Sequence, residues 1–311
     1  METEIIQNLL KDSSFKGITM HRVNYNGKRA YIRPEPFKVY SGLTGALESA
    51  TFRGDMDSRR ITKWREAQIE QFGSVEKHSQ HMDAMADFGT YLHMALVEIW
   101  NKKEYTFDQE AAREWFMRSD KANGIEHNEL SMNMRVFEHH KAVCSLMQFV
   151  HDEVSEIIAI ETMACSDQYS IATPLDIIYK DKKGIVCNVN MKTSNQIGEH
   201  HKNQVSIEKF LWNTTYPELQ VQKTGVWRGK DWMLAKGVPT YELVFVPDDA
   251  ERTNMILRKF DCVLSDPSAS YDNFKRETRV FTGTIALGEK PNIAVKTIEQ
   301  AFMESQEITV Q

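Results

Sequence analysis

The sequence has 311 residues, of which 41% are apolar and 26% charged, and its formal net charge is −6. These values are typical of a globular protein, and the negative charge excludes a protein that coats nucleic acid through overall basicity, although a local basic groove stays compatible with them. No run of about 18 apolar residues occurs, so we expect no transmembrane helix and no membrane partner. Residues 1–17 are acidic and amphipathic, which is not the pattern of a signal peptide.

The four cysteines, Cys144, Cys165, Cys187 and Cys262, lie far apart in the sequence. Because none has CxxC spacing, a zinc ribbon or an iron–sulfur cluster is not expected. Each is predicted to be a small core residue. Scattered thiols together with 15 methionines indicate a reducing, cytoplasmic location.

The N-terminal half is predicted to be mostly helical. Residues 25–42 read as short extended pieces between turns, and a helical pattern runs from Leu43 to about Glu110. Gly73 is a plausible helix end within it. One helix there has an apolar stripe, and another is expected over residues 128–154. The stripe consists of Met85, Phe88, Leu92, Leu96 and Ile99.

The second half begins with a predicted three-stranded antiparallel meander. Its strands are residues 156–165, 171–180 and 184–193, which are rich in Ile, Val and Thr and are separated by turn residues. A helical segment over 203–229, a strand over 239–249 and helices over 252–266 and 295–305 follow. This order predicts an α/β fold with a central mixed sheet flanked by helices.

We expect one compact domain with three parts. Residues 1–110 would hold the first strands and helices, residues 111–265 the core sheet and the helix after the meander, and residues 266–311 a helical tail.

The third strand of the meander has one polar face. Asn188, Asn190 and Lys192 alternate with apolar residues, so they share a face. Burying polar groups without partners costs free energy, so partners must exist. Counting back from a turn near residues 182–183 places Asp176 opposite Val189 or Asn190. The simplest interpretation is a buried Asp–Lys ion pair with polar support. The other is a divalent-metal site of the kind that assists phosphodiester hydrolysis.

The stretch "TPLDIIYKDKKGIVCNVNMKTS" resembles the core of the PD-(D/E)xK nuclease superfamily. "FGTYLHMALVEIW" is similar to the GTxxH helix of its RecB-like branch, and residues 46–73 and 159–176 are similar to phage RecE-type and mitochondrial genome maintenance exonucleases. The resemblance covers about residues 40–250. It implies a restriction-endonuclease-like core and a Mg²⁺- or Mn²⁺-dependent DNA exonuclease of phage recombination or repair, in the host cytoplasm if the chain is phage-encoded.

The resemblance also implies roles for single residues. His93, Glu161, Asp176 and position 190 would hold the metal, Lys192 would activate or orient the attacking water, and a glutamine on the helix after the meander would face the site. Gln220 is the best match and Gln204 competes with it, although neither is followed by the family's tyrosine four residues later. Helices before the sheet would arch over a single strand with a free end. A single-strand annealing or recombination protein is an implied partner.

Position 190 is the sharpest departure, because the family has an acid there and this chain has Asn190. An amide oxygen can bind Mg²⁺ but carries no charge, so we expect weakened or absent activity. Pro174, before Asp176, also departs from the family pattern.

Basic and aromatic residues follow the expected glutamine helix. Lys223, Trp227, Arg228 and Lys230 combine phosphate-binding charge with a ring that can stack on bases, so they are candidate DNA contacts; a solvated helix end is the alternative. At the level of the whole chain, two other functions stay open. One is a nuclease fold that has lost catalysis and binds DNA or a protein, and the other is a structural protein with a buried ion pair.

Overall fold

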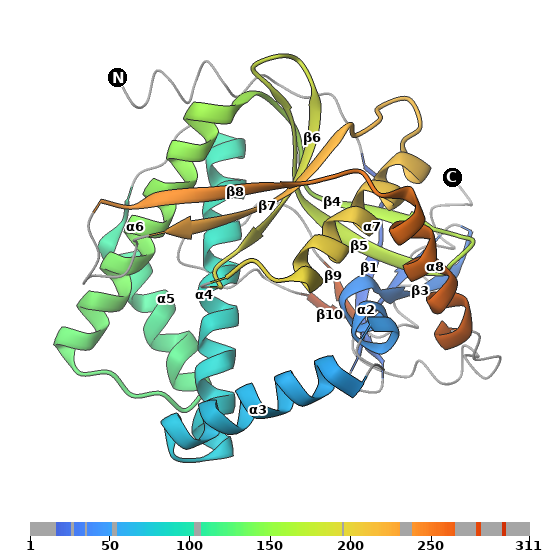
Figure 1. The fold of residues 1–311 in the computed structure, drawn as a ribbon. Coiled ribbons are helices and arrows are strands. Elements are labelled where there is room, and N and C mark those ends of the chain that lie inside the picture. Colours follow the sequence, from blue (N-terminus) through green and yellow to red (C-terminus); the bar gives the residue numbers. More distant parts are fainter. Residues whose placement is uncertain are drawn as a thin grey trace.

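The protein is described here from a computed structural model. The described residues are 17–25, 28–34, 36–51, 55–102, 107–194, 196–230, 238–264, 278–280 and 294–296. Within them the chain forms a mixed α/β structure with an open, mostly antiparallel sheet flanked by helices (Figure 1).

The sheet order is β10-β9-β1-β2-β3-β5-β6-β7-β8, and β4 pairs with β5 outside this path. The contacts β3–β5 and β6–β7 are parallel and the other strand pairs are antiparallel. The strands are β1 (His21–Tyr25), β2 (Lys28–Arg33), β3 (Lys38–Gly42), β4 (Val154–Ser166), β5 (Ile171–Asp181), β6 (Val186–Lys192), β7 (Lys223–Lys230), β8 (Thr240–Val246), β9 (Thr278–Val280) and β10 (Ala294–Lys296).

Two groups of helices cover the sheet. Figure 1 shows α4, α5 and α6 on one side of the central strands and α2, α7 and α8 on the other, with α3 extending below. The helices are α2 (Leu43–Thr51), α3 (Asp55–Phe72), α4 (Val75–Lys102), α5 (Gln109–Ala122), α6 (Glu129–Glu153), α7 (Glu199–Thr215) and α8 (Ala250–Leu264). Among the described helices, none is long and apolar enough to cross a membrane.

The predicted meander is confirmed as β4, β5 and β6. Gly184 adopts a left-handed φ of 79° in the tight turn between β5 and β6, where glycine has no steric penalty. The apolar face of β6 is also confirmed, because Cys187, Val189 and Met191 lie in the core cluster that α4, α5 and α6 build. The predicted N-terminal extended pieces are present as β1, β2 and β3. Helix α3 ends just before Gly73, as expected, and Gly73 has a left-handed φ of 81°.

The helix predicted over residues 203–229 is wrong in its second half. Helix α7 ends at Thr215 because Tyr216 precedes Pro217, and the residue before a proline is pushed out of helical backbone geometry; Tyr216 has φ −129° and ψ 70°. Residues 223–230 are strand β7 instead. Helix α5 was not predicted as a separate element. The tail predicted to be helical contains two short strands, β9 and β10, and its other residues after position 264 lie outside the described part.

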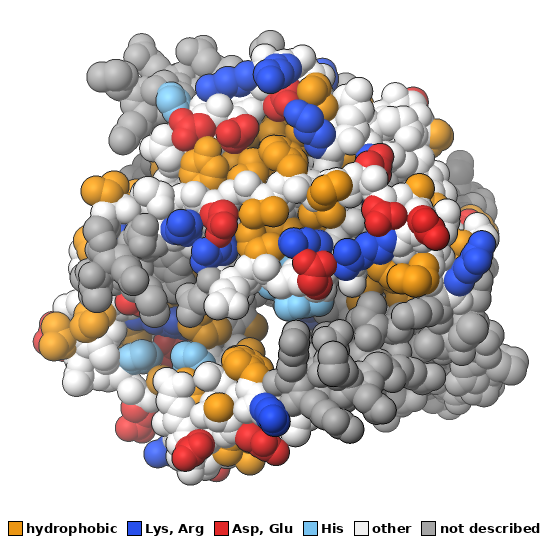
Figure 2. Space-filling model, viewed as in Figure 1, with side chains coloured by type: hydrophobic (Ala, Val, Ile, Leu, Met, Phe, Trp, Pro, Cys, Tyr) orange, Lys and Arg blue, Asp and Glu red, His pale blue; other side chains and the backbone are white. Residues whose placement is uncertain are grey.

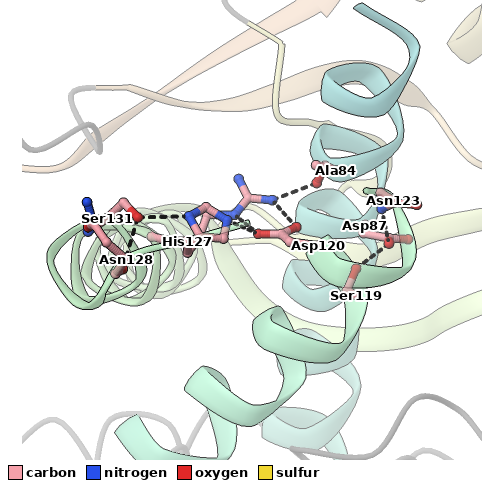
Figure 3. Close-up of polar contacts among 9 residues, drawn as sticks. Ala84, Asp87, Ser119, Asp120, Asn123, His127, Asn128 and Ser131 are labelled. Atoms are coloured by element: carbon pink, nitrogen blue, oxygen red, sulfur yellow. Dashed lines mark hydrogen bonds and ion pairs between the residues drawn. The ribbon is translucent and has the colours of Figure 1, made fainter. Parts of the chain in front are cut away.

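A buried polar network ties the helices of the first half together (Figure 3). Asp120 of α5 is 1% exposed and accepts hydrogen bonds from Arg135 of α6 and from His127. Arg135 also donates to the backbone carbonyl of Ala84 on α4, at 2.8 Å. Asp87 of α4 accepts from Asn123 at the end of α5. These bonds fix the axis of α4, the helix that carries His93.

Candidate metal centre

The candidate site lies where two neighbouring strands separate. Strands β5 and β6 pair from Lys180↔Val186 to Ile177↔Val189, and one further step of this register places Asp176 opposite Asn190, one of the two partners that the sequence predicts. Beyond this point β6 remains paired with β7, and β5 remains paired with β4. Asp176 spans the gap through its side chain, because its Oδ2 accepts a hydrogen bond from the backbone N–H of Met191 at 2.6 Å.

Three predicted ligands meet at this gap. His93 Nδ1 lies 2.5 Å from Glu161 Oε1, and His93 Nε2 lies 3.9 Å from Asp176 Oδ2. One ligand atom from each of the three residues lies within 4.8 Å of the others. Helix α4 delivers His93 from above the sheet, and its Gly89, one turn earlier, passes close to Thr193 at the end of β6. The convergence of His93, Glu161 and Asp176 agrees with the sequence prediction.

Glu161 has an unusual backbone. Its φ is 46°, in the left-handed region that a non-glycine residue adopts at a cost of about 1–2 kcal/mol. The register of β4 with β5 on both sides of it, Ile160↔Ile177 and Thr162↔Leu175, puts Glu161 directly opposite Asp176. Strained backbone of this kind concentrates at functional sites, where the surrounding structure imposes it.

The charges at the centre are strongly coupled. Burial lowers the pKa of His93, but the carboxylates of Asp176 and Glu161 outweigh burial and raise it to about 9, so the imidazole is a cation between two acids. Burial raises the pKa of Asp176, while His93 opposes that shift. Lys192 lies near enough to lower the pKa of both groups. Its ammonium has no carboxylate at ion-pair distance among the described residues.

The amides of β6 have a partner that the sequence analysis missed, Glu208 of α7. Asn190 Nδ2 donates to Glu208 Oε1 at 2.9 Å, and Asn188 Nδ2 donates to Oε2 at 3.2 Å. Gln204, one turn earlier on α7, donates to Oε1 at 2.8 Å. Glu208 is fully buried; burial, and then the like charge of Asp176, raise its pKa to about 7. Lys192 shares the site-facing side of β6 with both asparagines.

A signal for Glu208 existed in the sequence. Gln204 and Glu208 are four residues apart, so a helix places them on one face. Gln204 competed with Gln220 for the glutamine role, and neither has the family's tyrosine; the position of that tyrosine after Gln204 holds Glu208. The family pattern has a tyrosine at that position and therefore does not indicate an acid there.

Two predicted site residues are corrected. Gln220 lies in the loop after α7, is exposed, and donates to the carbonyls of Asn213 and Pro217, so it does not face the centre. The glutamine that does is Gln204. Trp227 is fully buried in the core beside Phe149, because β7 is a strand whose alternate residues point inward, so this ring is not available to stack on bases.

The predicted cationic DNA contacts are distributed along β7. Arg228 is the register partner of Lys192 and pairs with Glu242 at 2.5 Å. Lys223 lies at the other end of the strand, 3.3 Å from Asp181, and Lys230 is exposed. On the face shown in Figure 2, the surface is hollowed to the right of α4, and Lys, Arg and His side chains lie on the upper rim of the hollow.

The donor set fits a divalent cation. Two carboxylates and an imidazole, close together and partly buried, suit Mn²⁺ and, through their oxygens, Mg²⁺. Asn190, opposite Asp176 in register, has a buried Oδ1 without a hydrogen-bond partner among the described residues, and Asn188 Oδ1 is buried without one as well. A structural ion pair fits the same three side chains, because protonated His93 balances the acids. No protein-family model matches the sequence, and no curated protein matches it at a significant level of similarity.

Proposed function

We propose that this chain is a divalent-metal-dependent deoxyribonuclease that hydrolyses DNA from a free end. The observation that carries the proposal is the meeting of His93, Glu161 and Asp176 at the point where β5 and β6 separate, with Lys192 on the adjoining face of β6. A structural ion pair accounts for His93 and the acids. It does not account for Lys192 beside them, which has no carboxylate at ion-pair distance among the described residues.

Each residue would have a definite task. Bound Mg²⁺ or Mn²⁺ would stabilise the negative charge that builds on phosphate oxygens during attack. Asp176, Glu161 and His93 would hold the ion, and Asn190 would contribute an uncharged oxygen. The Lys192 ammonium would orient the attacking water and stabilise the phosphate charge. Arg228, next to Lys192 in register, would bind a neighbouring phosphate on the DNA strand.

The decisive experiment measures hydrolysis of end-labelled single-stranded and duplex DNA with Mg²⁺ or Mn²⁺. We expect weak activity that disappears with EDTA, with Asp176→Asn and with Lys192→Ala, and that increases with Asn190→Asp. Lys182→Ala, an exposed lysine in the turn after β5, is the matched control and should act like the unmodified protein. Circular single-stranded DNA should resist, since it has no end. Equal cleavage by Lys192→Ala and the unmodified protein would contradict the assignment.

A second candidate function is a binding module on a nuclease fold. Asn190 favours it, because a neutral side chain replaces the acid that the family resemblance requires. This alternative predicts DNA binding without hydrolysis in both the unmodified protein and Asn190→Asp. A purely structural role predicts that neither metal nor DNA changes the melting temperature.

A further inference from the structure

The hydrogen bonds of Glu208 determine which way the Asn190 amide points. Asn190 Nδ2 donates to Glu208 Oε1 at 2.9 Å. With Glu208 ionised, the opposite rotamer would place the amide oxygen against a carboxylate oxygen, two acceptors without a hydrogen between them. The chemistry of the contact therefore fixes the orientation, and the Asn190 Oδ1 atom is turned away from Glu208.

That oxygen is buried and unused. Asn190 is 2% exposed, and its Oδ1 has no hydrogen-bond partner among the described residues. A buried acceptor left in this state costs about 1–3 kcal/mol. The strand register places Asn190 opposite Asp176, at the gap between β5 and β6 where His93 and Glu161 also meet. This position makes the oxygen a candidate ligand for a cation held at the gap.

In its ionised form, Glu208 carries the negative charge that position 190 lacks. Three amides converge on its carboxylate, from Asn188, Asn190 and Gln204. The residue lies in the sheet-facing side of α7 and is fully buried. Groups that hydrogen-bond to a metal ligand set its orientation and its strength as a donor.

We propose that Asn190 binds the divalent cation through Oδ1, and that Glu208 is the positioning residue that orients this amide and supplies the displaced negative charge. The inference rests on the metal centre of the proposed function. It assigns Glu208 to that centre and explains how the centre operates without an acid at position 190.

The test places a carboxylate at position 190 and removes the carboxylate at position 208, separately and together. Mn²⁺ affinity is measured by calorimetry for the unmodified protein, Glu208→Gln, Asn190→Asp and the double variant Asn190→Asp/Glu208→Gln. Glu208→Gln should weaken Mn²⁺ binding about 10- to 100-fold, the usual effect of removing a group that orients a ligand. The double variant has the same charge as the unmodified protein and should regain most of the affinity. Asn190→Asp alone should bind Mn²⁺ more tightly.

Two results would overturn the inference. One is unchanged Mn²⁺ affinity in Glu208→Gln, and the other is a loss that Asn190→Asp does not repair although urea unfolding shows that the double variant is folded. Should Glu208→Gln not fold, Asn190→Ala tests the same ligand with Glu208 present, and unchanged Mn²⁺ affinity there overturns it equally.

DNA hydrolysis by the same variants separates this inference from the proposed function. The expected affinity pattern without hydrolysis would refute the nuclease and leave the arrangement of Asn190 and Glu208 standing. Metal-dependent hydrolysis without that affinity pattern would support the nuclease and refute the roles assigned to Asn190 and Glu208.

Discussion

His139 should make the protein sensitive to mild acid. It lies fully buried on α6, stacked on Tyr91 at 4.3 Å between ring centroids and edge-on to Phe88 at 5.6 Å. Neither ring nitrogen has a hydrogen bond of good geometry to another described residue. Burial lowers the pKa of His139 from 6.5 to about 3, and the backbone of Tyr91 opposes this shift only in part.

The sign and size of the effect follow from proton linkage. Below pH 6.5 the unfolded chain binds a proton at this position and the folded chain does not, so stability falls as pH drops from about 6.5 towards 3. A pKa lowered from 6.5 to about 3 corresponds to about 5 kcal/mol, and roughly half of it is already lost at pH 4.5. That is a large part of the stability of an ordinary domain.

The assay compares urea unfolding of the unmodified protein and His139→Phe at pH 7.5 and pH 4.5. Phenylalanine keeps the ring stacked on Tyr91 and cannot be protonated. Between these two pH values we expect the unmodified protein to lose about 2–3 kcal/mol more than the variant. His151→Gln is the matched control, because His151 is on the same helix with a half-exposed side chain. Parallel losses in His139→Phe and the unmodified protein would refute the reasoning.

Three further changes have expected outcomes for stability, measured by urea unfolding at pH 7.5. Asp120→Asn should cost about 3 kcal/mol, because it leaves Arg135, whose side chain is only 12% exposed, without its counter-charge, and a loss below about 1 kcal/mol would contradict this. Glu161→Gly should be about 1 kcal/mol more stable than Glu161→Ala, since both remove the carboxylate and only glycine relieves the left-handed backbone; the reverse order would exclude that strain. Gly184→Ala should cost about 1 kcal/mol at the turn, where φ is 79°, and an unchanged unfolding midpoint would count against it.

The three strands of the meander and the faces of their side chains could be predicted from the sequence, because the turn residues and the side-chain alternation indicate the same strands. Turn residues at 182–184 fix the register between β5 and β6, and alternation then assigns each side chain to a face. Counting back from the turn places Asp176 opposite Val189 or Asn190, and the observed register selects Asn190. His93 could be added only through the family motif, since a helix stripe does not say which strand the helix will cross.

The region after the meander was predicted less well because two signals conflict. Residues 203–222 have helical composition, but Pro217 forces the backbone out of the helix at Tyr216. A predicted helix that ignores this stop extends into β7. It places Trp227, which is a core residue, on the surface. It also favoured Gln220, beyond the helix end, over Gln204 within it.

Two departures from local preference lie on either side of Asp176. Glu161, opposite it on one side, has left-handed backbone in the interior of a strand. Asn190, opposite it on the other side, has a buried oxygen without a partner among the described residues. Either feature alone would be a defect that a small substitution could remove. A sequence that specifies one structure normally satisfies such rules and breaks them where function requires it. One such departure on each side of the Asp176 carboxylate favours a ligand-binding centre over an ion pair, because an ion pair needs neither feature.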